Sequence, residues 1–174
     1  MIGGDGTHKG IESLYKLMKE KEVDIAIGGI PKTIDNDIPI IDKSFGFDTA
    51  VHEAVNAIDC ANTEAIACQK GVGLVKLMGR HAGFIALYAS LASRDVNFCF
   101  CPEFKTKFYG KFGFFERLCH RFMNGKNHSV VVIAEGMDES VPDVDLGKDA
   151  GFDKSGNKLH AVSLIFKSRT WGSS

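Results

Sequence analysis

The sequence predicts an α/β fold, with a mostly parallel sheet covered by helices on both faces in a Rossmann-like arrangement. Three observations support this fold class. Short apolar runs alternate with longer segments in which apolar residues recur at helical spacing. Strands that alternate with helices form parallel sheets whose two faces are both covered. A glycine-rich or acidic stretch follows each apolar run, as in sheets that bind ligands beyond the carboxyl ends of their strands.

The expected elements follow one another along the chain. Residues 1–2 end a first strand, and apolar residues at helical spacing predict a helix over 11–18 that ends in the charged run "KEKE". Further strands are expected at 23–29, 72–78, 96–101 and 129–136, and further helices at 47–69, 81–94, 113–125 and 159–168. A long polar loop is expected at 137–158.

Composition excludes several classes of function. The formal net charge is -1, whereas a nucleic-acid-binding protein needs a basic excess, so Lys105, Lys107 and Lys111 are interpreted as a solvated face. The apolar runs are shorter than the roughly 18 residues of a membrane span, and no signal-peptide pattern is present. We therefore expect a cytoplasmic protein without nucleic-acid or membrane partners. Its five cysteines are interpreted as small buried residues, and Cys99 and Cys101 share one face of their strand.

The first unusual stretch is "GGDGT", where three glycines surround Asp5 at a strand-to-helix turn. Glycines let the backbone approach a phosphate closely, and the free N–H groups of a helix start favour an anion. Asp5 would repel that phosphate, so it is a candidate ligand for a bridging Mg²⁺. The alternative interpretation is a tight turn that begins a helix.

The second stretch is "PKTIDND". In an extended segment Asp35 and Asp37 point the same way, and two close carboxylates raise one pKa, which suits a general base acting on an alcohol. Lys32 can steady a phosphate, and Thr33 can donate a hydrogen bond to a transferred group. The alternative interpretation is a solvated acidic loop. It weakens because other unusual residues converge on the same edge of the sheet.

Those residues end the later strands. Arg80 of "MGR" offers a planar fork that suits phosphate or transition-state charge, and the alternative is a surface ion pair. Glu135 of "AEG" is a candidate acceptor for sugar hydroxyls or, alternatively, a turn acid. Glu103 is interpreted as structural. These residues together indicate phosphoryl transfer to a hydroxyl group. The set comprises glycines that can bind phosphate, an aspartate that can bind a metal ion, a candidate general base and an arginine.

At this point the motifs resemble those of the phosphofructokinases. "GGDGT", "PKTIDNDI", "FGFDTA", "GLVKLMGRHAGFIA" and "IAEG" occur in that family's order and at compatible separations. The resemblance extends to about Leu159 and is most similar to the plant-type, ATP-dependent branch. It implies that 1–174 is a single partial catalytic region, truncated at both ends, of an allosteric, oligomeric glycolytic enzyme.

The resemblance implies a role for each motif residue in phosphorylating fructose 6-phosphate to fructose 1,6-bisphosphate with ATP and Mg²⁺. Asp35 is expected to take the proton from the primary hydroxyl of the sugar, with help from Asp37 and Thr33. The catalytic set also includes Lys32 and Arg80. The residues expected to bind the sugar phosphate are Thr33, Asp35, Met78, Gly79, Arg80 and Glu135. Those expected along the nucleotide phosphates are Gly4, Asp5, Gly6 and Thr7, with Asp5 serving the metal.

The phosphoryl donor depends on two positions. Gly6 stands where an aspartate accompanies pyrophosphate use in the family, whereas Lys32 stands where pyrophosphate enzymes carry lysine. The plant-type ATP enzymes combine both residues, so ATP is expected and pyrophosphate is the alternative.

Gly71 replaces an arginine that reaches a neighbouring subunit in short bacterial members. The family's N-terminal glycine loop is absent, so the isolated chain is expected to be inactive. The alternative is a non-catalytic homologue that binds ligand or partner subunits.

Overall fold

The structure is a computed structural model in which residues 1–140 are described. The helices are α1 (Asp5–Glu20), α2 (Phe47–Ala67), α3 (Phe84–Ser93), α4 (Phe114–Met123) and the 3-10 helix η1 (Glu135–Ser140). The strands are β1 (Ile2–Gly3), β2 (Ile30–Pro31), β3 (Gly71–Leu77), β4 (Phe98–Phe100) and β5 (His128–Ala134). They form two separate parallel sheets, with the orders β1-β2 and β3-β5-β4.

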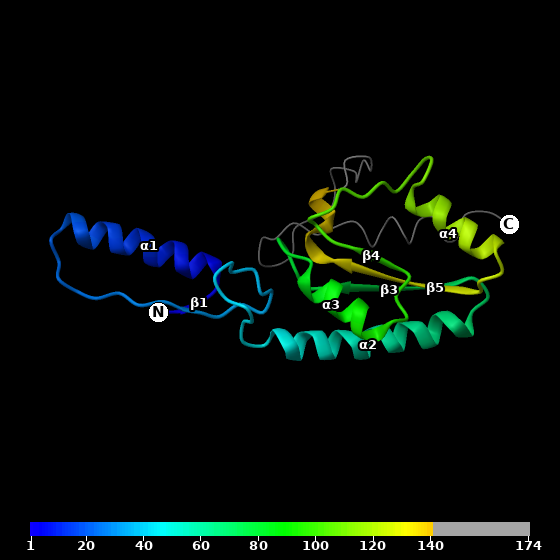
Figure 1. Ribbon diagram of the computed structural model, residues 1–174, viewed down its shortest axis with the longest axis horizontal. Coiled ribbons are helices and arrows are strands. Elements are labelled where there is room, and N and C mark those ends of the chain that lie inside the picture. The colour runs from blue at the N-terminus through cyan, green and yellow to red at the C-terminus, as the bar shows by residue number, and fades with distance from the viewer. Residues whose placement is uncertain (141–174) are drawn as a thin grey trace, which may run out of the picture.

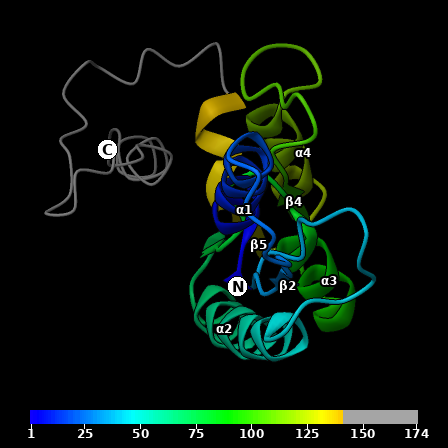
Figure 2. The same cartoon turned by 90° about the vertical axis from the view of Figure 1, so that its left-hand side faces the viewer.

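Strand β5 is the centre of the main body, and its side chains alternate between two hydrophobic clusters. Val130 and Val132 face one cluster with α2 and α3, whereas Val131 and Ile133 face the other with Phe108 and α4. Figures 1 and 2 show the helices α2 and α3 on one side of this sheet and α4 on the other. The expected parallel sheet with helices on both faces is therefore confirmed.

Helix α2 packs closely on the edge strand β3. Gly46, in the left-handed conformation at φ 88°, precedes this helix, and an alanine-rich sequence allows a close approach to the sheet. A Cβ atom at Gly71 would overlap the carbonyl of Ala65, and one at Gly73 would lie 2.7 Å from the carbonyl oxygen of Ala61. The two glycines thus set the distance between α2 and the strand that leads to Arg80.

The N-terminal part extends away from this body. In Figure 1 the helix α1 and strand β1, drawn in blue, lie beside the sheet rather than on it. No residue of α1 is buried, and Leu14, Tyr15 and Leu17 are exposed. The strand expected at 23–29 is wrong: only Ile30–Pro31 pair, with β1, and Val23 and Ile25 lie exposed. An apolar run forms a strand only where a neighbouring strand accepts its backbone hydrogen bonds.

The other expected elements within residues 1–140 are confirmed, although α1 begins at Asp5, six residues before its expected start. The helix expected at 81–94 begins later, at Phe84, because the segment before it forms the loop that carries Arg80. Of the loop expected at 137–158, residues 137–140 belong to η1, and the remainder lies outside the described residues, as does the helix expected at 159–168.

Candidate active site

The two N-terminal motifs are in direct contact. The backbone N–H of Lys32 donates to the carbonyl of Gly3 over 2.7 Å, which ties the segment after β2 to the turn after β1. A Cβ at Gly4 would lie 3.6 Å from the carbonyl oxygen of Lys32 and 3.7 Å from Cβ of Thr33. The pairing of β1 with β2 therefore brings the glycine turn beside the segment that leads to Asp35.

The turn after β1 leaves the first amides of α1 available. Gly4 is the N-cap residue, and no side chain caps the helix. Thr7 packs over Gly3, where a Cβ would overlap its side chain. A Cβ at Gly6 would meet no atom within 4 Å, so the space above this turn is open. Uncapped amides beside open space suit a phosphate group.

Asp5 forms an ion pair that the sequence analysis did not anticipate. Its Oδ2 lies 2.6 Å from Nζ of Lys9, one helical turn later. The hydrogen bond to Asp5, then the charge of Asp5 and that of Asp37, raise the pKa of Lys9. The spacing of Asp5 and Lys9, four residues apart in a helix, was the signal that could have predicted this pair.

The carboxylates around Lys9 fit a small cation. Oδ1 of Asp37 is buried and has no hydrogen-bond partner among the described residues. Within 1–140, no group of three or more His, Cys, Asp or Glu side chains is placed to hold a metal. Mg²⁺ in phosphoryl-transfer sites takes one or two carboxylates and fills its remaining positions with water and phosphate. Asp5, together with the orphan oxygen of Asp37, fits that requirement.

Asn36 shapes the acidic loop. The expected extended segment is wrong, because the chain turns at Ile34–Asp35 and Asn36 has a left-handed backbone at φ 55°. Oδ1 of Asn36 accepts the N–H of Ser44 over 2.8 Å, and its Nδ2 donates to the carbonyl of Asp42 over 3.2 Å. Asparagine tolerates this conformation better than most residues. Its position between two acids was the only sequence signal of this role.

The loops after β3 and β5 are locked together. The N–H of Gly136 donates to the carbonyl of Gly79 over 3.0 Å, and a Cβ at Gly136 would overlap the carbonyl of Arg80. Gly79 has φ 128°, a conformation that favours glycine. Nη2 of Arg80 lies 3.9 Å from Oε1 of Glu135, and the Arg80 side chain is 54% exposed, which leaves the guanidinium accessible to a ligand.

Asp35 lies where these loops and the N-terminal motifs meet. Partial burial, followed by the charges of Asp37 and Glu135, raises its pKa above the ordinary value. The backbone and then the guanidinium of Arg80 act in the opposite direction and lower the pKa of Asp35. The expected convergence of Asp35, Asp37, Arg80 and Glu135 is thus present, across two separate sheets. A half-buried carboxylate with a raised pKa suits a general base.

The remaining candidates fall into two groups. Thr33 is half-buried beside Gly4, whereas Lys32 and Met78 are exposed. Glu103 is structural, because its Oε1 accepts the N–H of Gly83 over 2.7 Å before α3.

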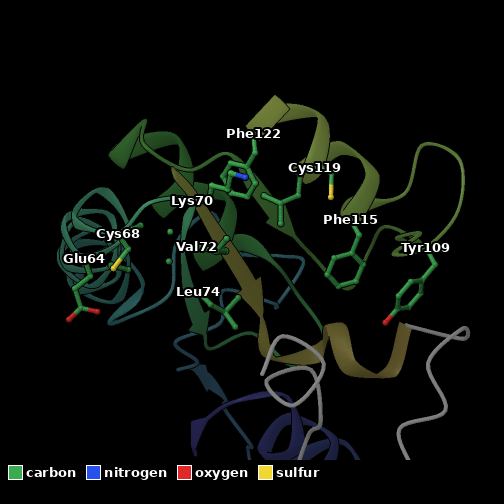
Figure 3. Close-up of a pocket in the computed structure, with 14 residues that line it drawn as sticks. Glu64, Cys68, Lys70, Val72, Leu74, Tyr109, Phe115, Cys119 and Phe122 are labelled. Atoms are coloured by element: carbon green, nitrogen blue, oxygen red, sulfur yellow. The ribbon is translucent and has the colours of Figure 1, made fainter. Parts of the chain in front are cut away.

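Two cavities differ in their relation to these residues. A cavity of about 550 Å³ is lined by Ile34 and Met78, which adjoin Asp35 and Gly79 in sequence, and by α2. A second, of about 760 Å³, lies between α2 and α4 along the edge of β3; Figure 3 shows Cys68, Val72 and Phe115 around it. It contains none of the candidate catalytic residues, so we place the candidate active site at Asp35 and the first cavity beside it.

Comparisons with known proteins agree with this arrangement. The model of the family described as Phosphofructokinase matches residues 1–167. An Arabidopsis thaliana protein named ATP-dependent 6-phosphofructokinase 1 is 50% identical over 164 residues, covering 91% of this chain and 34% of the relative. An Entamoeba histolytica protein named ATP-dependent 6-phosphofructokinase is 46% identical over 171 residues, covering 95% of this chain and 36% of the relative.

Solved structures show the same fold. Phosphofructokinase from Saccharomyces cerevisiae matches with a TM-score of 0.58 and 27% identity, over 81% of this chain and 21% of that one. Pichia pastoris phosphofructokinase in the T-state matches with a TM-score of 0.63 and 23% identity, over 82% of this chain and 16% of that one. The chain thus spans about a third of the length of its curated relatives. Within the described residues, no helix has the length and apolar character needed to cross a membrane.

Proposed function

Since the chain belongs to the phosphofructokinase family, we propose that it carries the general base and the sugar side of an ATP-dependent 6-phosphofructokinase site. The observation that best supports this proposal is the environment of Asp35, whose pKa is raised by partial burial and by the charges of Asp37 and Glu135 and lowered by Arg80. The product is fructose 1,6-bisphosphate. Further partners are other subunits of an oligomer and, through the family, allosteric effectors. We place the protein in the cytoplasm or, as for relatives named chloroplastic, in the plastid.

Asp35 is the base in this proposal. It accepts the proton of the primary hydroxyl of fructose 6-phosphate while the hydroxyl oxygen attacks the γ-phosphorus of ATP. The bond from that phosphorus to the β,γ-bridging oxygen breaks, and ADP leaves with the electron pair. Asp37 and Glu135 keep the pKa of Asp35 raised, which favours proton uptake. Arg80 stabilises charge on the transferred group, and its accessible guanidinium supports this role.

The other residues bind and orient. Met78 and Gly79 line the sugar side with Arg80 and Glu135, and Thr33 donates a hydrogen bond near Gly4. Lys32 is exposed beside that turn and steadies a phosphate of the donor.

The donor side lies at the start of α1. Gly4, Gly6 and Thr7 accommodate the nucleotide phosphates at the uncapped amides of that helix. Asp5 and the buried Oδ1 of Asp37 would hold Mg²⁺, which would replace Lys9 as the cation beside Asp5. Bound Mg²⁺ supplies charge neutralisation for the phosphates. The open space at Gly6 leaves room for a nucleotide, so ATP is the proposed donor and pyrophosphate the alternative.

A chimera tests this proposal. We would replace the matched stretch of the Arabidopsis thaliana relative with this chain and assay fructose 6-phosphate phosphorylation with ATP and with pyrophosphate, side by side. Turnover with ATP at an ordinary kinase rate, about 1–100 s⁻¹, is expected. Preference for pyrophosphate would show that Lys32 and not Gly6 indicates the donor. A folded chimera without turnover would favour a non-catalytic homologue.

A further inference from the structure

A third pocket lies over β4 and is lined by no residue of the candidate active site. Its volume is about 320 Å³, and it is bounded by Phe98 and Phe100 of β4, by the loop that follows this strand, and by the first turn of α4. Small-molecule sites in proteins occupy about 300–1,000 Å³, so this pocket has room for a small ligand. The comparisons assign no function to it.

Three cations line this pocket, and residues 1–140 provide none of them with a carboxylate partner. Within residues 1–140, Lys105, Lys107 and Arg117 form no ion pair. Nε of Arg117 donates to the carbonyl of Phe112 over 3.1 Å, which orients the guanidinium and leaves its terminal nitrogens for a ligand. The carboxylate of Glu116, in the same turn, accepts the N–H of Phe112 instead of pairing with a cation. The pocket therefore has a strong excess of positive charge.

The floor of the pocket is aromatic. The ring of Phe114 meets the rings of Phe98 and Phe100 edge to face, at centroid distances of 5.0 and 5.2 Å. Phe112 stands at the rim, 69% exposed, with Nζ of Lys111 above its ring at 5.3 Å. Aromatic side chains offer apolar contact area and favour a flat partner placed edge to face or offset.

The loop that carries two of the cations is anchored at Lys107–Phe108 to the start of α4. The N–H of Phe114 donates to the carbonyl of Lys107 over 2.9 Å, and that of Phe115 donates to the carbonyl of Phe108 over 3.2 Å. Phe108 itself is buried in the core, with 1% of its surface exposed. The loop base at Lys107 is thus fixed relative to Arg117 on α4, so these two cations are held over a common floor and do not belong to an independent surface tail.

We propose that this pocket binds a small ligand in which a phosphate group is attached to a flat ring. The cations of Lys105, Lys107 and Arg117 complement a phosphate dianion, and the planar guanidinium can bind two of its oxygens at once. The ring lies on the floor formed by Phe98, Phe100 and Phe114. The interpretation of Lys105 and Lys107 as merely solvated is replaced by this one.

Phenyl phosphate is the probe that tests the site, with inorganic phosphate and phenol as its two halves. Calorimetric titration of the 174-residue chain at 0.15 M salt limits binding by diffuse surface charge. We expect saturable binding of one phenyl phosphate, at least tenfold tighter than either half. Lys105→Ala/Lys107→Ala should weaken this binding at least tenfold. Lys111→Ala removes one charge from the same loop outside the pocket and should change the affinity less than twofold.

Arg80→Ala separates this site from the candidate active site, and it too should change the affinity less than twofold. The proposal is overturned if Lys111→Ala weakens binding as much as the double variant, which would indicate diffuse charge. It is also overturned if inorganic phosphate binds as tightly as phenyl phosphate, or if Arg80→Ala abolishes binding. An unchanged affinity in a folded Lys105→Ala/Lys107→Ala variant contradicts it as well. None of these results depends on kinase activity.

Discussion

Arg80, in a loop of the β3-β5-β4 sheet, lies close enough to Asp35, in the acidic loop that follows β2, for its backbone and its guanidinium to lower the pKa of the Asp35 carboxyl. This contact places Asp35 between groups of opposite effect. Partial burial, Asp37 and Glu135 raise its pKa, and Arg80 lowers it. The pKa of Asp35 can therefore be raised or lowered by substituting its neighbours while Asp35 itself is kept.

The pKa of Asp35 should respond to its two neighbours with opposite signs. Arg80→Met removes a cation and keeps the backbone N–H, so the pKa should rise further, whereas Glu135→Gln removes an anion and should lower it. Carboxyl ¹³C NMR titration of the chain measures both shifts. Glu64→Gln, an exposed control on α2, should leave the titration unchanged. Shifts of the same sign in both variants would contradict the described geometry.

Asp35→Asn should raise the melting temperature at pH 7. Because the pKa of Asp35 is raised on folding, the folded state binds its proton more tightly than the unfolded chain, and the ionised carboxylate destabilises the fold above that pKa. The difference between variant and wild type should shrink as the pH falls through the pKa. Thermal unfolding followed by circular dichroism at pH 7 and pH 4 measures it. A variant that melts lower at pH 7 would show that the carboxylate has a stabilising partner.

Gly136→Ala should destabilise the chain by about 1–3 kcal/mol, because its Cβ would overlap the carbonyl of Arg80 and force the two loops apart. Urea unfolding measures the loss. Gly10→Ala is the control: a Cβ at Gly10 meets no atom within 4 Å, and alanine in the interior of α1 should be neutral or stabilising by up to about 1 kcal/mol. Equal stability of the Gly136→Ala variant would show that the loops after β3 and β5 move freely.

The isolated chain should self-associate and turn over fructose 6-phosphate below about 1 s⁻¹. Apolar side chains of α1 and of the segment after it, such as Leu14, Leu17 and Ile25, are exposed. Light scattering measures association, and a coupled assay measures turnover. Leu14→Lys/Leu17→Lys should reduce association, and the control Ser13→Lys should not. A monomer with an ordinary kinase rate would contradict this prediction.

The main body could be predicted from the sequence because its patterns are strong and local. The alanine-rich stretch gave α2, and the apolar run at 129–134 is buried on both faces as a central parallel strand requires. The approach of Arg80 and Glu135 followed from the rule that parallel strands of one sheet end at one edge, whereas Asp35 reaches them from β2 of the separate β1-β2 sheet.

The errors arose where the structure depends on distant partners. The apolar run at 23–29 resembles a strand, yet residues 1–140 provide no neighbour for it beyond the short β1. Asn36 bends the acidic loop through hydrogen bonds to Asp42 and Ser44, which residue spacing does not reveal. The ion pair of Asp5 with Lys9 competes with the expected metal role, and it was overlooked although its spacing is helical.

The central claim, that Asp35 is the base of a phosphoryl transfer to a sugar hydroxyl, is tested most directly in the active chimera with Asp35→Asn. Asparagine keeps the shape of the side chain and cannot accept the proton. We expect turnover with ATP to fall by about 10²–10⁴, with fructose 6-phosphate binding within a few-fold of the unmodified chimera. Asp42→Asn, in the same loop, is the control and should keep turnover within about threefold. Near-normal turnover of the Asp35→Asn chimera would contradict the assignment.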